Sequence, residues 1–341
     1  MGLEERVVGG VLGLALGDAL GAPFAGRRAA EIPSPIPVFE LPWRGGPPGS
    51  TTDATAMARN LVRSLSDRPG FDPNDVVRRH LEWFQTEPPA VEALTRRVLS
   101  RVAAGEDAVA AATALWEERG PEVSAGNGSV MYCAPLGFAY ANRPEQLLEL
   151  APALSGLTHF DGRCKTAVLA VTFAAATLAK GEDGRTAVAG ALREVEELEG
   201  GEELEYLVEE VGQARPVDGP DHGFCLFTAA MGLQAALADA SFEDELGKAI
   251  ALGGDTDTNG AVAGALLGAR GGFGGLPDAW LDRLNDRGAI EEEARRLALS
   301  ADRSLRTEAT EEDATGSRTS ANPDPTTGRS PPAARTPRRS R

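Results

Sequence analysis

The chain has 341 residues, of which 42% are hydrophobic, and its formal net charge at pH 7 is -17. This length and apolar share are enough for one large domain or two. The negative charge argues against general nucleic-acid binding and against an anionic membrane surface, because both would repel most of this protein. Ala, Leu, Gly and Glu dominate the composition, and alternating β-branched runs are rare, so the pattern favours an all-α fold.

The first predicted element is an apolar run over residues 7–16. Glu4 and Glu5 precede this run and Asp18 follows it, so it resembles neither a signal peptide nor a membrane span and is too short to cross a bilayer. We expect a buried first helix in a cytoplasmic, monomeric protein. The Pro/Gly-rich segment 30–50 comes next, and we expect a loop there that closes over a site as a lid.

Residues 48–57, Pro-Gly-Ser-Thr-Thr-Asp-Ala-Thr-Ala-Met, place hydroxyls and a carboxylate at the start of an apolar helical stretch. Two later segments, 74–119 and 183–214, have the spacing of amphipathic helices with charged outer faces. His80 lies in the first of them, and His222 follows the second. Both histidines are expected to be structural or to lie on the surface.

Two further loops carry polar residues before apolar segments. Residues 124–131, Ser-Ala-Gly-Asn-Gly-Ser-Val-Met, form a loop of the kind that presents backbone amides to an anion. Residues 154–161, Leu-Ser-Gly-Leu-Thr-His-Phe-Asp, precede an Ala-rich helix predicted over 165–178. A lone histidine such as His159 is more often structural than functional.

The cysteines and the C-terminal segment add no further site. The three cysteines are widely spaced and odd in number, so they indicate neither a disulfide framework nor a zinc pattern and are expected as buried thiols; they are Cys133, Cys164 and Cys225. From residue 303 the chain is rich in Thr, Ser, Pro and Arg. This composition predicts a helical domain over 1–302 and a disordered tail over 303–341.

The segment 252–260, Leu-Gly-Gly-Asp-Thr-Asp-Thr-Asn-Gly, crowds two carboxylates beside three glycines immediately before an apolar helix. Asp255 and Asp257 repel each other unless a cation lies between them. Oxygen donors alone favour Mg²⁺, Mn²⁺ or Ca²⁺ over zinc. The segment therefore predicts a site for a hard cation.

Three local interpretations compete for this segment. A calcium-binding EF-hand loop needs glutamate at its twelfth position, which here is Leu266. A phosphatase motif of the Asp-x-Asp-x-Thr/Val type needs Thr or Val at Asn259 and a strand before it. The third interpretation is a helix N-cap, in which Asp257 or Thr258 caps a helix over 259–270. Capping and metal binding can coexist.

Five motifs in chain order resemble those of the ADP-ribosylglycohydrolase family, and together they span roughly residues 5–285. They are Gly-Asp-Ala-Leu-Gly-Ala-Pro at 17–23, Thr-Asp-Ala-Thr at 52–55, Gly-Asn-Gly-Ser at 126–129 with Met131 after it, Thr-His at 158–159, and Gly-Gly-Asp-Thr-Asp-Thr at 253–258. The resemblance implies a compact multi-helix domain with a binuclear metal centre between the second and fifth motifs.

The same resemblance implies roles for individual residues. The metal would be one or two Mg²⁺ ions, or Mn²⁺, held by Thr52, Asp53, Asp255, Asp257 and Thr258. An ADP-ribose substrate would meet Asn127, Gly128, Ser129, His159 and Gly254. His159 would position the substrate rather than transfer a proton. The catalytic candidates are Asp53 and Asp257.

Three positions depart from the family pattern. Ala54 replaces the second carboxylate of Thr-Asp-Asp-Thr, Ala25 stands where an acidic residue often follows the first motif, and Tyr132 stands where arginine is common. Loss of a general base typically costs roughly a hundred- to ten-thousand-fold in rate. The acidic residues that remain as possible substitutes are Glu31, Glu40 and Asp161.

Two functions fit this pattern. In the first, the protein is a Mg²⁺-dependent hydrolase that cleaves the glycosidic bond between ADP-ribose and a protein side chain or small molecule. In the second, it is a catalytically degenerate relative that binds ADP-ribose or a nucleotide, or that serves structurally. The number of surviving metal ligands distinguishes the two functions. Loss of a single carboxylate weakens Mg²⁺ binding without necessarily abolishing it, because water can fill the vacated position.

Overall fold

The structure is a computed structural model that describes residues 1–68 and 70–316, and over these residues the chain is helical and has no β-strand. The all-α prediction is confirmed. Residues Met1–Ser304 form one compact unit. The α-helices of the described part are α1 (Leu3–Gly21), α2 (Asp53–Asp67), α3 (Pro73–Phe84), α4 (Ala93–Ala103), α5 (Ala108–Arg119), α6 (Ala134–Ala139), α7 (Leu147–Gly156), α8 (Gly162–Lys180), α9 (Gly184–Val195), α10 (Gly201–Gly212), α11 (Cys225–Leu237), α12 (Phe242–Ala251), α13 (Thr256–Gly271), α14 (Asp278–Leu281) and α15 (Arg287–Gly316).

Helix α1 is the buried first helix that the sequence predicts, and it is longer than the apolar run. By length and composition the segment Leu3–Phe24, with a mean hydropathy of 1.6, is able to cross a membrane. However, 94% of its apolar window is buried inside the protein. The protein core therefore accounts for the hydrophobicity of this helix.

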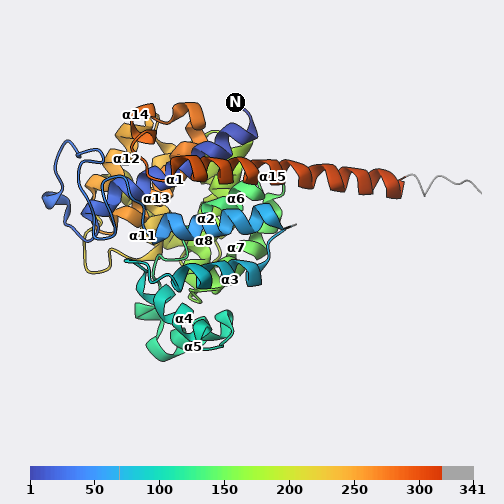
Figure 1. Ribbon diagram of the computed structural model, residues 1–341, viewed down its shortest axis with the longest axis horizontal. Coiled ribbons are helices and arrows are strands. Elements are labelled where there is room, and N and C mark those ends of the chain that lie inside the picture. The colour runs from blue at the N-terminus through green and yellow to red at the C-terminus, as the bar shows by residue number, and fades with distance from the viewer. Residues whose placement is uncertain (69, 317–341) are drawn as a thin grey trace, which may run out of the picture. The chain divides into compact units, whose positions relative to one another are not determined.

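Glycines on one face of α1 bring this helix into backbone contact with α13, which lies beside it (Figure 1). A Cβ atom at Gly13 would overlap the carbonyl oxygen of Gly264, and one at Gly17 would overlap that of Gly260. The spacing of four residues keeps these glycines on one face of each helix. The close approach places the C-terminal half of α1 beside the N-terminal end of α13.

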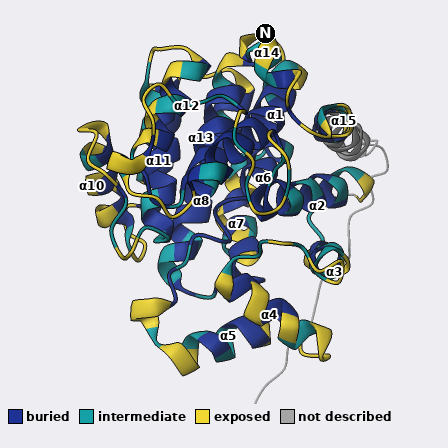
Figure 2. Cartoon of the chain, turned by 60° about the vertical axis from the view of Figure 1, so that its left-hand side comes forward, coloured by how far each residue is buried: buried dark blue, intermediate teal, exposed yellow. Residues whose placement is uncertain are grey.

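Helix α8 lies at the centre of the domain, where it packs against α6, α7, α9, α11 and α13. Figure 2 shows α1, α8 and α13 almost entirely buried, while α4, α5 and α10 expose one face. Helix α8 begins at Gly162, three residues before the predicted start, because the Asp161 carboxylate accepts the Arg163 N–H and caps the helix.

The predicted amphipathic segments are confirmed as several capped helices. Segment 74–119 forms α3, α4 and α5, and segment 183–214 forms α9 and α10. Three N-cap carboxylates, Asp72, Glu92 and Asp107, accept backbone N–H groups of the first turns of α3, α4 and α5. These caps separate helices that hydrophobic periodicity alone does not divide.

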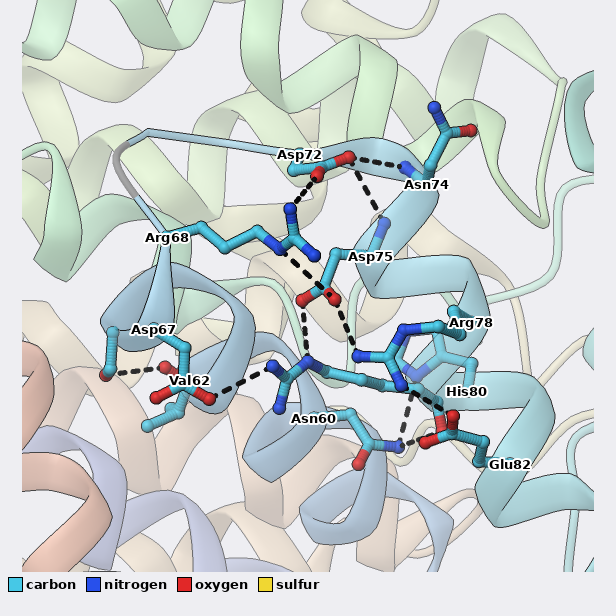
Figure 3. A network of polar contacts seen from close by, with 12 residues as sticks. Asn60, Val62, Asp67, Arg68, Asp72, Asn74, Asp75, Arg78, His80 and Glu82 are labelled. Atoms are coloured by element: carbon cyan, nitrogen blue, oxygen red, sulfur yellow. Dashed lines mark hydrogen bonds and ion pairs between the residues drawn. The ribbon is translucent and has the colours of Figure 1, made fainter.

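His80 is structural, as predicted. Its ring is fully buried and meets the ring of Tyr132 edge-on, with 5.1 Å between centroids. The Asn60 amide lies 3.3 Å from His80 Nδ1, next to the ion-pair network around Asp75 (Figure 3). Tyr132 is thus a core residue. The three cysteines are free and buried, as expected.

The last helix of the described part, α15, runs from Arg287 to Gly316. The chain therefore remains helical beyond residue 302, where the tail was expected to begin. The rest of that predicted tail, residues 317–341, lies outside the described residues.

Candidate functional site

The interpretation in which Asp257 or Thr258 caps α13 is wrong. The helix begins at Thr256, earlier than expected, and its N-cap residue is Asp255, whose side chain makes no capping hydrogen bond. Instead, Asp255 Oδ2 accepts a hydrogen bond from Asn127 Nδ2 at 2.7 Å. Gly253 and Gly254 before it have φ values of 78° and 75°, so the chain turns sharply into the helix.

Helix α2 begins at Asp53, and Thr52 is its N-cap. The Thr52 hydroxyl donates to Asp18 Oδ1 at 2.7 Å and accepts the Ala54 N–H at 3.3 Å. Asp18 Oδ2 also accepts the backbone N–H groups of Thr52 and Thr55, at 2.9 and 3.0 Å, and the Thr55 hydroxyl at 2.5 Å. The Asp18 carboxylate of α1 therefore holds the start of α2 in place.

Asp18 is a site residue to which the sequence analysis assigned no role. It is fully buried within α1, among residues that are nearly all apolar. An ionisable residue in such a helix is rarely buried without a partner, and this was the signal in the sequence. Because Gly17 beside it contacts Gly260 of α13, helix α1 contacts both acidic segments.

Burial and neighbouring acidic side chains oppose the ionisation of two carboxylates in this region, Asp53 and Asp257. Burial raises the pKa of Asp257 above its usual value, and the carboxylates of Asp255, Asp18 and Asp53 raise it further. Burial also raises the pKa of Asp53 to about 6, although the N–H of Glu92 bonded to it favours the charged form. A cation among these groups would relieve the repulsion.

The donor types present fit a hard divalent cation. Thr52 uses its proton on Asp18 and one lone pair on the Ala54 N–H, which leaves a second lone pair. Within residues 1–68 and 70–316, no three His, Cys, Asp or Glu side chains already form a ligand set by themselves. A complete set here needs threonine hydroxyls or water beside the carboxylates, and Mg²⁺ accepts both kinds of oxygen.

The structure places the Gly-Asn-Gly-Ser loop against the acidic loop, but it turns the side chains inward. Asn127 Nδ2 bonds Asp255 and also Thr228 Oγ1, which in turn donates to Asn259 Oδ1 at 2.7 Å. Ser129 is fully buried, and its hydroxyl lies 3.0 Å from that of Ser155. Asn127 therefore orients a predicted metal ligand, and contact of Gly128 or Ser129 with ADP-ribose stays a prediction.

His159 lies beside this loop and faces Glu92. Its Nδ1 is 2.9 Å from Thr158 Oγ1, and its Nε2 is 3.4 Å from Glu92 Oε2. The backbone N–H of Glu92 donates to Asp53 Oδ2 at 2.7 Å. Glu92 thus links the predicted metal loop to the predicted substrate loop. Nothing in the sequence pointed to Glu92, because its surroundings carry no motif of their own.

Gly254 joins the acidic loop to the segment after α1. Its N–H donates to Arg27 O at 2.9 Å, and its carbonyl accepts the Gly26 N–H at 2.8 Å. Its amide is therefore engaged within the protein. Ala25, next to this bridge, is exposed. The departure at Ala25 therefore lies at the edge of the site.

The other candidate acids lie in different settings. Glu31 is exposed and accepts the Arg28 N–H, and Glu40 is also exposed. Asp161 is buried and accepts hydrogen bonds from Trp116 Nε1 and from Arg163. Burial opposes its ionisation, but these donors hold its pKa below the usual value. Asp161 is therefore a paired structural carboxylate.

Residues 213–224, for which the sequence predicts no site, complete the surroundings. Val217 N–H donates to Leu252 O at 2.9 Å, and Gly223 O accepts the Asn127 N–H at 3.0 Å. His222 packs close to Gly254, and its Nδ1 is buried without a hydrogen-bond partner. The segment therefore touches both polar loops.

The described part of the chain is thus an all-helical protein in which two acidic helix starts, those of α2 and α13, lie beside the C-terminal half of α1. A model of the ADP-ribosylglycohydrolase family matches residues 1–307, and the chain belongs to this family.

Individual relatives agree with this assignment. The chain is 28% identical over 307 residues to the ADP-ribosyl-[dinitrogen reductase] glycohydrolase of Rhodospirillum rubrum, with 86% of this chain and 94% of the relative covered. It is 26% identical over 326 residues to the human (Homo sapiens) ADP-ribosylhydrolase ARH3, with 81% and 88% covered. A solved structure described as an ADP-ribosylglycohydrolase-related protein complex is similar with a TM-score of 0.75 and 34% identity, covering 88% of this chain and 99% of that one.

Proposed function

We propose that this protein is a Mg²⁺-dependent hydrolase that cleaves the glycosidic bond between ADP-ribose and a protein side chain or small molecule. The observation that carries the proposal is the meeting of two acidic helix starts, Thr52-Asp53 and Asp255-Thr256-Asp257, around the Asp18 end of α1. The similarity to an ADP-ribosyl-[dinitrogen reductase] glycohydrolase supports the substrate class.

In this proposal Thr52, Asp53, Asp255, Asp257 and Thr258 hold one or two Mg²⁺ ions, with Mn²⁺ as an alternative. When bound, the metal supplies Lewis-acid polarisation of ribose hydroxyls and of water. Asn127 keeps Asp255 in orientation, and Asp18 does the same for the start of α2.

Asp53 and Asp257 are the proposed proton acceptors. Burial and the neighbouring carboxylates raise the pKa of both. These shifts apply without a metal, and a bound cation would favour the charged carboxylates, which are the forms that can accept a proton. The alanines at 25 and 54 supply no replacement, so we expect slow turnover.

The test is release of free ADP-ribose from arginine-, serine- and small-molecule-linked conjugates, with Mg²⁺ or with EDTA. The Asp257→Ala variant serves as the inactive control, and the conjugate released fastest identifies the linkage. Release that is equal in EDTA, or unchanged in the variant, contradicts the proposal.

The degenerate binding protein is the second candidate, and a specific observation favours it. Alanine has no carboxyl group, and it stands at two positions where the family pattern has acidic residues. Ala54 is fully buried directly after Asp53, and Ala25 is exposed at the site edge. Calorimetric binding of ADP-ribose by a sample that releases none from any conjugate would establish this function instead.

A further inference from the structure

Glu92 is the point at which three parts of the candidate site converge. Its backbone N–H reaches Asp53 Oδ2, and its Oε2 lies 3.4 Å from His159 Nε2. A Cβ atom at Gly128 would lie 2.7 Å from Glu92 Oε2 and 2.8 Å from His159 Cε1. Only glycine fits there without displacing the carboxylate or the imidazole.

The carboxylate of Glu92 is held rigidly at the start of α4. Oε1 accepts the Leu94 N–H at 2.9 Å, and Oε2 accepts the Thr95 N–H at 2.7 Å. These bonds fix the side-chain rotamer at the positive end of the helix dipole. The side chain still exposes 20% of its surface, so solvent reaches this side chain although backbone N–H groups hold its carboxylate oxygens in place.

The Nε2 atom of His159 faces the Glu92 carboxylate. The residue is 1% exposed, and Nε2 is buried without a hydrogen-bond partner of normal geometry. An ionised carboxylate only accepts hydrogen bonds. The nitrogen that faces Glu92 therefore carries a proton, and in the neutral ring Nδ1 accepts from the Thr158 hydroxyl.

We propose that Glu92 is a positioning residue of this site, whose carboxylate orients the His159 imidazole while its amide orients Asp53. The expected effect on ADP-ribose recognition rests on the proposed function. It assigns the two tasks to different atoms. Removal of the side chain should therefore disturb His159 and leave the amide bond to Asp53 in place.

Two variants separate this role from simple helix capping. Glu92→Asp retains a preferred N-cap residue but shortens the side chain by one methylene, so it loses reach toward His159. Glu92→Ala loses both the cap and the reach. The matched control is Asp107→Ala, which removes the N-cap carboxylate of the neighbouring helix α5 at an exposed position.

The first readout needs no ligand. The chain has three histidines, so selective ¹⁵N labelling yields few imidazole signals, and His159→Gln assigns the relevant one. We expect a protonated Nε2 in the unaltered protein, a changed Nε2 shift in both Glu92 variants, and no change in Asp107→Ala. An unchanged His159 signal in Glu92→Asp and Glu92→Ala overturns the proposal.

The second readout is calorimetry with ADP-ribose and, separately, with Mg²⁺. Both Glu92 variants should bind ADP-ribose about tenfold more weakly, as expected for loss of a charge-assisted hydrogen bond, and Mg²⁺ within twofold of the unaltered protein. If ADP-ribose affinity falls in Glu92→Ala and equally in Asp107→Ala, but not in Glu92→Asp, the loss comes from the missing helix cap, and the positioning role is refuted. Absence of ADP-ribose binding by the unaltered protein refutes the proposed function, and the imidazole signals still decide the role of Glu92.

Discussion

The carboxylate of Asp18 accepts both the backbone N–H and the hydroxyl of Thr52, at 2.9 and 2.7 Å. These bonds tie the start of α2 to α1, whose glycine face touches α13. The geometry of the candidate metal site therefore depends on one buried acid that is not among its expected ligands.

Replacing Asp18 should loosen the first acidic loop. Asp18→Asn keeps the shape but substitutes an NH₂ donor for one acceptor, leaving N–H or O–H groups of Thr52 and Thr55 without partners. We expect a loss of roughly 1–3 kcal/mol in unfolding free energy and weaker Mg²⁺ binding, measured by denaturant titration and calorimetry. Thr55→Val removes a single hydroxyl and should cost less. Equal effects of the two variants would contradict the central role of Asp18.

The contact between α1 and α13 leaves no space for a side chain. Gly17→Ala should destabilise the protein by about 1–3 kcal/mol or more, because the new methyl group overlaps the Gly260 carbonyl. Gly247→Ala in α12 is the matched control. Nothing lies within 4 Å of a Cβ there, so helix propensity should stabilise it by roughly 0.5–1 kcal/mol. Chemical denaturation of both variants checks this, and a neutral Gly17→Ala would refute the close packing.

Neutralising Asp257 should have opposite effects with and without metal. In EDTA, Asp257→Asn removes a charge that Asp255, Asp18 and Asp53 repel, so the Tm should rise. In Mg²⁺ the metal-induced increase in Tm should shrink or vanish, because a ligand is lost. Thermal unfolding in both buffers measures the two shifts. Glu182→Gln, an equal charge change at an exposed position between α8 and α9, should alter neither shift.

Asp53 should make Mg²⁺ affinity depend on pH. Its pKa is raised, mainly by burial, to about 6, so protons compete with the metal below that pH, and the Kd should rise up to about tenfold per pH unit. In the metal-free protein a low pH is favourable instead, because protonation of Asp53 stabilises the folded state. The stabilising contribution of protonated Asp53 is fully present below 3.8 and is lost as pH rises through about 6. Calorimetry and thermal unfolding between pH 5 and 7.5 test both trends, and Asp53→Asn should flatten them.

Ion pairs at Glu293 should stabilise the protein in the usual acid-sensitive direction. Burial opposes its ionisation, but Arg59 and Arg63 hold its pKa below the usual value. This contribution is present above the unfolded pKa of 4.5 and is lost as pH falls through the lower folded value. Glu293→Gln should destabilise the protein at pH 7 and reduce the loss of stability on acidification. An unchanged acid-unfolding profile would exclude this contribution.

Local chemistry in the sequence determined the helical class, the buried first helix, the free cysteines and the family. Hydrophobic spacing and short motifs carry this information because each depends on residues close together in the chain. The departures at Ala25 and Ala54 were also visible in the sequence.

Only the tertiary structure decided which groups meet. Sequence spacing does not show that Asn127 bonds Asp255, that Asp18 holds Thr52, or that Glu92 lies between Asp53 and His159. The misplaced cap of α13 has the same cause, since Asp255 bonds a side chain 128 residues away instead of its own helix. The glycine faces of α1 and α13 set how closely these two helices pack, and packing between distant segments is not encoded in any local pattern.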